Sequence, residues 1–253
     1  MKGLRVLAVA VLLIFAQRAE AQSYRLQYEA QVLGVVPIGR ASYEVSTSGG
    51  RYLARATVRT TGVAQLFDQT QISAAAAGAL RAAGPAWSTY NLSHGYARKF
   101  RRIDMQRTRE GVSAVVAPRF GDMGSPPATP AQQNASHDPL TAIFALGRQI
   151  GAAGACNGRV NVFDGRAHYR LSASGGTRGA FHGGGYNGPA IRCSLNYSPI
   201  AGYTNGEERR AAPPRADAWF ALPADRGFGA LLQLNVSTPV GPARLDLRGY
   251  EKT

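Results

Sequence analysis

Apolar and polar residues alternate with a period of two along most of this chain, which is the pattern of half-buried β-strands. The first stretch begins at Ser23, where Tyr24, Leu26 and Tyr28 would face a core while the residues between them face solvent. The same alternation predicts strands over residues 41–45, 52–58, 68–74, 87–92, 98–105, 112–116, 167–174, 191–197, 218–222, 231–238 and 243–250. We therefore expect about a dozen strands in one domain.

Breaks in the alternation predict the turns, the connections and one helix. Ser48-Gly49-Gly50 and Ser93-His94-Gly95 are predicted hairpin turns, and residues 61–67 a helical turn. The alanine- and glycine-rich residues 75–85 are predicted to be a connection, and residues 118–135, rich in Pro, Gly, Ser and Gln, a mobile loop. A helix begins after the N-cap Asp138 with Pro139 at its first position, and its apolar stripe would cover the concave side of a curved sheet. That stripe consists of Leu140, Ile143, Phe144 and Ile150.

The first 21 residues have the features of a cleavable secretory signal peptide. Lys2 and Arg5 precede an apolar run over residues 6–16, and Ala19-Glu20-Ala21 is a small-x-small cleavage site. The apolar run is shorter than the roughly 20 residues that a membrane-spanning helix needs. We therefore expect cleavage after Ala21, a single β-rich domain over residues 22–253 without a transmembrane segment, and a periplasmic location.

The only two cysteines, Cys156 and Cys193, each lie at the edge of a run with strand periodicity. An exported protein with an even number of cysteines is expected to form a disulfide. We predict a Cys156–Cys193 bridge that joins two neighbouring strands; two buried free thiols are the alternative.

The chain is strongly basic, with a formal net charge of +14, and 26 of its 29 basic residues are arginine. Arginine suits phosphate and carboxylate groups, and a field of this sign favours anionic partners. Export argues against nucleic acid, so the expected partners are anionic lipid or an acidic envelope polymer. The alternative is that the charge is only solvated surface.

The strand over residues 98–105 carries cations on both of its faces, because four basic residues occupy five positions. A central core strand would leave such charges buried and unpaired, so this strand is expected at a sheet edge or along an open groove. We predict that a basic patch on it contacts phosphate-bearing lipid; protection of a sheet edge is the alternative. The patch comprises Arg98, Lys99, Arg101 and Arg102.

Motifs for catalysis or metal binding are sparse. The four histidines, His94, His137, His168 and His182, lack the spacing of metal ligands, and no cofactor motif is present. Asp164 and His168 could form a hydrolase-like dyad, but no nucleophile elbow accompanies them. Phe163-Asp164-Gly165-Arg166 is more simply a tight hairpin turn.

Several segments together resemble one family of exported bacterial proteins, the domain-of-unknown-function 3108 family. They are Gly39 with the strand after it, residues 59–67, residues 137–144, Val162-Phe-Asp-Gly-Arg166 and Pro199-Ile-Ala-Gly-Tyr203. The resemblance implies a mainly β protein whose single curled antiparallel sheet, a half-barrel or β-spiral, holds one main α-helix, and it implies no catalytic residue. We therefore expect a non-enzymatic envelope protein that binds an anionic or amphiphilic ligand such as lipid. The alternatives are a hydrolase using Asp164 and His168, and a purely structural or interaction protein.

Overall fold

The computed structural model describes residues 21–66, 69–96, 99–207, 216–238 and 241–253. These residues form one open antiparallel sheet of thirteen strands in the order β7-β6-β5-β4-β3-β2-β1-β13-β12-β11-β10-β9-β8. The strands are β1 (Gln22–Val32), β2 (Val36–Ser48), β3 (Arg51–Thr60), β4 (Gln71–Arg81), β5 (Gly84–Tyr96), β6 (Lys99–Arg107), β7 (Val112–Ala117), β8 (Arg159–Phe163), β9 (His168–Gly183), β10 (Tyr186–Ala201), β11 (Ala216–Ala221), β12 (Leu231–Thr238) and β13 (Gly241–Lys252). The helices are η1 (Gly62–Leu66), α1 (Pro130–Asn134) and α2 (Pro139–Ala153).

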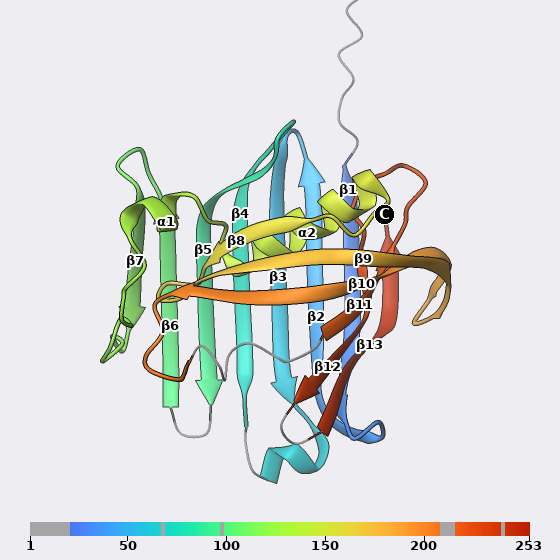
Figure 1. The fold of residues 1–253 in the computed structure, drawn as a ribbon, viewed down its shortest axis with the longest axis horizontal. Coiled ribbons are helices and arrows are strands. Elements are labelled where there is room, and N and C mark those ends of the chain that lie inside the picture. The colour runs from blue at the N-terminus through green and yellow to red at the C-terminus, as the bar shows by residue number, and fades with distance from the viewer. Residues whose placement is uncertain (1–20, 67–68, 97–98, 208–215, 239–240) are drawn as a thin grey trace, which may run out of the picture.

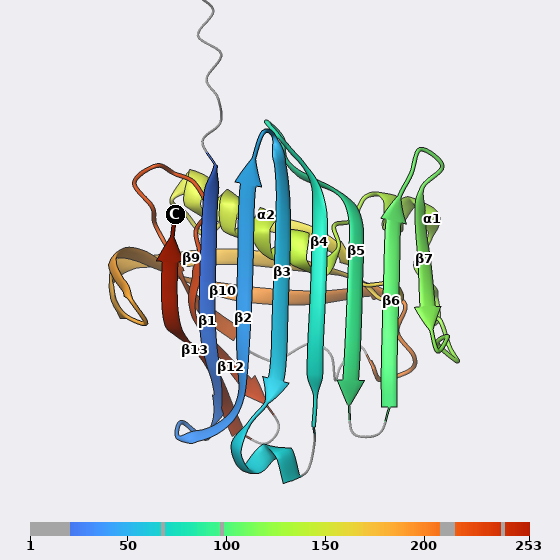
Figure 2. The same cartoon turned by 180° about the vertical axis from the view of Figure 1, so that it is seen from behind.

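The sheet curls so that its second half lies across its first half, with α2 between them (Figure 1). Strands β1 to β7 form one wall, and β8 to β10 cross in front of the helix (Figure 1), while the opposite view shows the outer face of the first wall (Figure 2). Leu140 and Phe144 of α2 pack on the first wall, and Leu146 and Ile150 pack on the second. The predicted curled sheet with one main helix on its concave side is confirmed.

Asp138 caps α2 as predicted, and its carboxylate accepts from the backbone N–H groups of Leu140 and Thr141. Ile143, however, is 41% exposed, so its place on the buried stripe was wrongly predicted. Because α2 is covered on two opposite sides, only a narrow face of it reaches solvent. Gly147 shows how close the packing is, since an added Cβ would lie 2.7 Å from the carbonyl oxygen of Gly229.

The alanine- and glycine-rich segment that was predicted to be a connection is mostly strand. Residues 75–81 continue β4, where the small side chains of Ala74 and Ala76 face the core on the inner side of the sheet. Residues 175–183 likewise continue β9, and the turn before β10 is only Gly184 and Gly185. Residues 75–81 lack large alternating side chains, because small residues pack against the core there. Strand β5 extends to Tyr96, so Ser93-His94-Gly95 is part of a strand and not the predicted hairpin turn.

The Cys156–Cys193 disulfide is confirmed, with a Cα–Cα distance of 5.5 Å. Its predicted surroundings were partly wrong, because Cys156 lies in the connection between α2 and β8 and not in a strand. Cys193 lies in β10, which is separated from β8 by β9. The bridge therefore ties the C-terminal end of α2 to the second half of the sheet.

The connecting segment 134–138 joins the two edges of the open sheet. On one side, His137 forms a parallel bridge with Val162 of β8, and its N–H donates to the carbonyl of Asn161 at 2.9 Å. On the other side, Oδ1 of Asn134 accepts from the backbone N–H of Val112 in the edge strand β7 at 3.0 Å, and the Arg107 guanidinium of β6 donates to the carbonyl of Ser136 at 2.6 Å. The loop over residues 118–135 that leads into this segment contains α1, which has a capping box at Thr129. Among the described residues, no helix has the length and apolar character to span a bilayer.

Candidate functional site

A cleft with a volume of about 510 Å³ lies between the two halves of the sheet, next to the first turn of α2. The inner faces of β5 and β6 form one wall, and β9, β10 and the β8–β9 turn form the other. The lining is rich in aromatic rings and also contains charged groups: Tyr90, Leu92, His94, Tyr96, Arg101, Ile103, Phe120, Pro139, Asp164, Arg166, Ala167, Tyr169, Tyr197, Tyr203 and Glu207. This size and composition are typical of a small-molecule site.

Tyrosines form the wall on the β9–β10 side. The rings of Tyr169 and Tyr197 stack with their centroids 4.6 Å apart, and the hydroxyl groups of Tyr197 and Tyr203 are hydrogen-bonded to each other. Burial raises the pKa of all three phenols above the usual value, so they are neutral hydrogen-bonding groups near pH 7. This wall can contact an apolar or ring-shaped group and still offer hydroxyl groups to polar atoms.

Asp164 holds the β8–β9 turn. Its carboxylate accepts from the backbone N–H groups of Arg166 and Ala167 at 3.0 and 2.8 Å, and Gly165 has a φ of 102°. The predicted Phe163-Asp-Gly-Arg turn is therefore confirmed. Burial raises the pKa of Asp164, although the two N–H donors partly offset that effect.

Arg166 forms a two-pronged ion pair with Glu207, at 2.9 and 3.0 Å between guanidinium and carboxylate atoms. Its Nε also donates to the carbonyl of Asp122 at 2.8 Å. The bond from Arg166, together with donors from Thr204, lowers the pKa of Glu207 to about 2. These two opposite charges satisfy each other and fix the position of residues 203–207.

Arg101 is the cation of the cleft without a carboxylate partner among the described residues. Its guanidinium carbon lies 4.2 Å from the centroid of the Phe120 ring, and its buried Nε has no hydrogen-bond acceptor in the described part of the chain. Cation–π contact orients the group but does not replace hydrogen bonds to the N–H donors. Arg101 therefore presents unused donors and a positive charge beside the aromatic wall.

The structure divides the predicted basic patch. Arg101 lies on the inner side of β6, whereas Arg102 lies on the outer side and pairs with Asp104 at 2.7 Å. Lys99 is exposed at the start of β6, and Arg98 lies outside the described residues. Strand β6 is not at the sheet edge, because β7 pairs with it; its inner side lines the cleft. Contact of this strand with lipid stays a prediction.

The geometry does not bring the candidate dyad together. Asp164 lines the cleft, but His168 is only 5% exposed, and neither of its ring nitrogens has a hydrogen-bond partner in the described ranges. Burial lowers the pKa of His168, so the ring is neutral near pH 7. None of the described residues that line the cleft is a serine or cysteine. Within the described ranges, no group of three His, Cys, Asp or Glu side chains could hold a metal ion.

The sequence indicated Arg101 as a binding residue and Asp164 as a turn residue or a member of a dyad, but it did not indicate the tyrosine wall. Tyr169 and Tyr197 lie on the paired strands β9 and β10, and only the curl of the sheet places them opposite Tyr90 of β5, which is far away in the sequence. One signal was available: three of the segments that carry the family resemblance supply Pro139, Asp164, Arg166 and Tyr203, which all line this cleft.

These residues define a class of protein in which an open, β-barrel-like antiparallel sheet encloses one long helix. Among solved structures, the chain is similar to a β-barrel-like protein of the domain of unknown function DUF1849 from Brucella abortus. That likeness has a TM-score of 0.56 and 11% sequence identity over 90% of this chain and 97% of the other, so it concerns the fold alone. No protein-family model and no curated protein sequence matches the chain, and the resemblance to the 3108 family stays a prediction.

Proposed function

We propose that this protein is a non-enzymatic, periplasmic cell-envelope protein that binds an anionic amphiphile, such as a lipid with an acidic headgroup, in the cleft. The observation that carries the proposal is the guanidinium of Arg101, which is partly buried beside aromatic rings without an anionic partner among the described residues.

The pairing of charged groups within the cleft supports an anionic ligand. Glu207 neutralises Arg166, and the carboxylate of Asp164 is bound by two backbone N–H groups of its own turn. Arg101 therefore remains as the group whose charge is not satisfied by the described residues. A carboxylate or phosphate on a ligand would receive charge-assisted hydrogen bonds from it, which are stronger than neutral ones.

The rest of the lining suits the apolar part of such a ligand. Leu92, Ile103 and the Tyr169 ring offer apolar surface deeper in the cleft. Burying that surface against a chain or ring contributes roughly 25 cal/mol per Å². The cleft thus combines one anionic anchor with an apolar wall, which is the arrangement that an amphiphile requires.

Fluorescence titration with a dansyl-labelled fatty acid, and with its uncharged methyl ester, tests the proposal. Arg101→Gln should weaken binding of the acid by about 10- to 100-fold, the equivalent of losing a charged hydrogen bond worth about 1.5–3 kcal/mol. Binding of the ester should change little. Arg102→Gln is the matched control, since it removes the same charge one residue away but on the outer face.

Mass spectrometry of lipids that co-purify with the native protein provides the second measurement. An acidic amphiphile should be present in the wild type and in Arg102→Gln and be depleted in Arg101→Gln. Equal binding of the acid by both variants, with equal co-purified lipid, would contradict an anchoring role for Arg101 and with it the proposal.

A further inference from the structure

Apolar side chains are exposed at one end of the first wall, where turns join its strands. We call this set the apolar rim: Leu33, Val35, Leu66 and Phe100, which are 60%, 79%, 81% and 52% exposed. Leu33 and Val35 lie in the β1–β2 turn and Leu66 in η1, and both elements are at the lower end of the sheet in Figure 2. Turns at the surface usually carry polar residues, so four large apolar side chains at one end need an explanation.

The backbone of Leu33 adds a second observation. This residue has a φ of 53°, a left-handed conformation that glycine or asparagine adopts with less strain than leucine. A strained residue that also exposes its apolar side chain is not explained by stability of the fold. Such outliers are found preferentially at functional positions.

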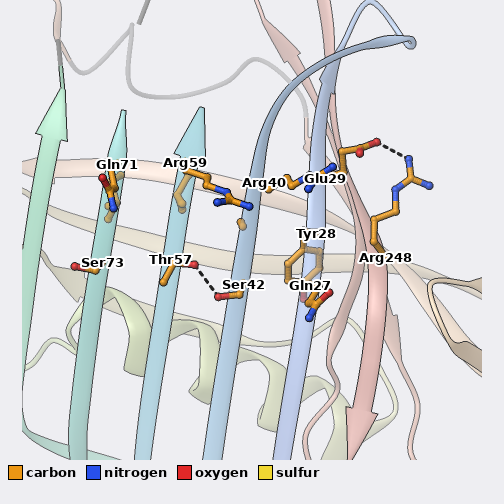
Figure 3. Close-up of a pocket in the computed structure, with 13 residues that line it drawn as sticks. Gln27, Tyr28, Glu29, Arg40, Ser42, Thr57, Arg59, Gln71, Ser73 and Arg248 are labelled. Carbon is orange, nitrogen blue, oxygen red and sulfur yellow. Dashed lines mark hydrogen bonds and ion pairs between the residues drawn. The ribbon is translucent and has the colours of Figure 1, made fainter. Parts of the chain in front are cut away.

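Arginines lie on the outer face of the strands that these turns connect (Figure 3). Arg40 of β2 and Arg59 of β3 are opposite each other in the sheet and line a groove of about 640 Å³. Neither guanidinium has a hydrogen bond or ion pair to another described residue. Glu29 of β1 lies opposite Arg40 and attracts it, but its carboxylate accepts a hydrogen bond from Arg248, at 2.8 Å, and not from Arg40. Like charges opposite each other destabilise a sheet, so an anion in the groove would relieve their repulsion.

The spacing of the two features matches a membrane surface. Arg59 lies three residues before η1 and Arg40 lies five residues after Val35, so roughly 10–17 Å of chain, at about 3.3 Å per residue, separates the arginine backbones from the turns. Long arginine side chains can extend along the surface and place the charged group closer to the turns. The headgroup layer of a bilayer is about 5–8 Å thick on each side. Apolar side chains at the turn tips would therefore reach the acyl boundary while the arginines remain at the level of the phosphates.

We propose that this end of the protein docks on an anionic phospholipid membrane, with the apolar rim entering the headgroup layer and Arg40 and Arg59 binding lipid phosphate. Charge selects the bilayer over an apolar protein partner, because the groove is basic and the chain as a whole carries +14. The arginine fork fits phosphate oxygens in pairs.

Docking in this orientation would bring the cleft to the lipid. Tyr96 lines the cleft and pairs with Lys99, where β5 ends and β6 begins. These strand ends lie at the same end of the sheet as the apolar rim (Figure 2). The docking residues are nevertheless separate from the cleft residues, so the two proposals can fail independently: variants of Arg101 test the cleft, and variants of the rim and groove test docking.

Vesicle co-sedimentation at about 0.1 M salt, with vesicles of equal parts phosphatidylglycerol and phosphatidylcholine, tests docking. Each basic residue near an anionic surface contributes about fivefold to partitioning, so Arg40→Gln with Arg59→Gln should lower the partition coefficient about thirtyfold. The matched control is Arg51→Gln with Arg81→Gln, which removes two exposed arginines at the opposite end of the same wall, on β3 and its neighbour β4. That control should change binding little, because the Debye length is about 10 Å.

The apolar contribution is tested with Val35→Asp and Leu66→Asp together. Both side chains are largely exposed, so folding should be unaffected, which thermal unfolding would verify. Val115→Asp is the control, as Val115 is 63% exposed but lies on the outer side of β7, where it pairs with Asp104. Loss of vesicle binding in the rim variant alone supports docking.

Three results would overturn the proposal. One is the absence of binding to the anionic vesicles by the wild type. Another is equal loss of binding in the groove variant and in its control at the far end. The third is a wild-type dimer in analytical ultracentrifugation that the rim variant converts to monomer without any effect on vesicles, which would assign the rim to contact between two copies of the chain.

Discussion

Replacing Asp138 by asparagine should change how the stability of the fold depends on pH. This carboxylate is fully buried at the N-terminus of α2, where Oδ1 accepts from two backbone N–H groups at 3.0 Å each and Oδ2 accepts from the hydroxyl of Thr141. Burial raises its pKa from 3.8 to about 6, even though these three donors favour the charged form. Asparagine is an equally good N-cap and can keep the backbone bonds, but it does not titrate.

The sign of the effect follows from proton linkage. Between about pH 4 and pH 6 the folded protein holds a proton on Asp138 that the unfolded chain has largely released, so this group stabilises the fold at low pH and loses that contribution as pH rises. The change in pKa corresponds to about 3 kcal/mol in total, at 1.36 kcal/mol per pKa unit. About 2.4 kcal/mol of it is lost between pH 4 and pH 7.

Urea unfolding of the wild type and Asp138→Asn across this pH range measures the difference directly, because the other titrating groups are common to both proteins. The free energy of unfolding of the variant, relative to wild type, should rise by about 2.4 kcal/mol from pH 4 to pH 7. Asp138→Ala should be less stable than Asp138→Asn at every pH, by at least about 1 kcal/mol, since two buried N–H groups lose their acceptor. A difference between wild type and Asp138→Asn that stays constant with pH would refute the reasoning.

Two further predictions concern links between distant parts of the chain. Replacing Cys156 and Cys193 by serine should lower the free energy of unfolding by about 4 kcal/mol, the chain-entropy value for a separation of 37 residues; a loss below about 1 kcal/mol in urea unfolding would contradict it. Because Arg166 and other donors lower the pKa of Glu207 to about 2, its stabilising contribution is present above the unfolded pKa of about 4.3 and lost as pH falls toward 2. Glu207→Gln should therefore be less stable than wild type at pH 7, by about 1 kcal/mol for this partly exposed pair, and the difference should disappear at low pH in the same assay.

Local pattern was sufficient for much of the fold. Strands with large apolar residues at every second position, such as β1 with Tyr24, Leu26 and Tyr28, were predicted because the inner face of each is buried and the outer face is solvated. The capped start of α2 at Asp138 was predicted because a carboxylate followed by proline satisfies the first free N–H groups of a helix.

Prediction failed where tertiary packing overrides local preference. In β4, alanines replace the large alternating residues because the inner face must leave room for α2, so the sequence lost its strand pattern. Ile143 was assigned to the buried face because a helix that lies on one sheet buries a single apolar stripe. Helix α2 instead contacts two walls on opposite sides, and Ile143 lies on the face between them that reaches solvent.

The site illustrates the same limit in a different way. An arginine next to another arginine on a strand indicates that one side chain points to each face, but only the curl of the sheet decides that the inner face at Arg101 meets Tyr169 and Tyr197 from the other half. The curl leaves two sheet edges, and the connecting segment 134–138 joins them through hydrogen bonds to β7 and β6 on one side and to β8 on the other. Because that segment spans the gap without extending the sheet, the walls beside it remain apart. The cleft with its unpaired cation is thus a consequence of leaving the barrel open at this edge.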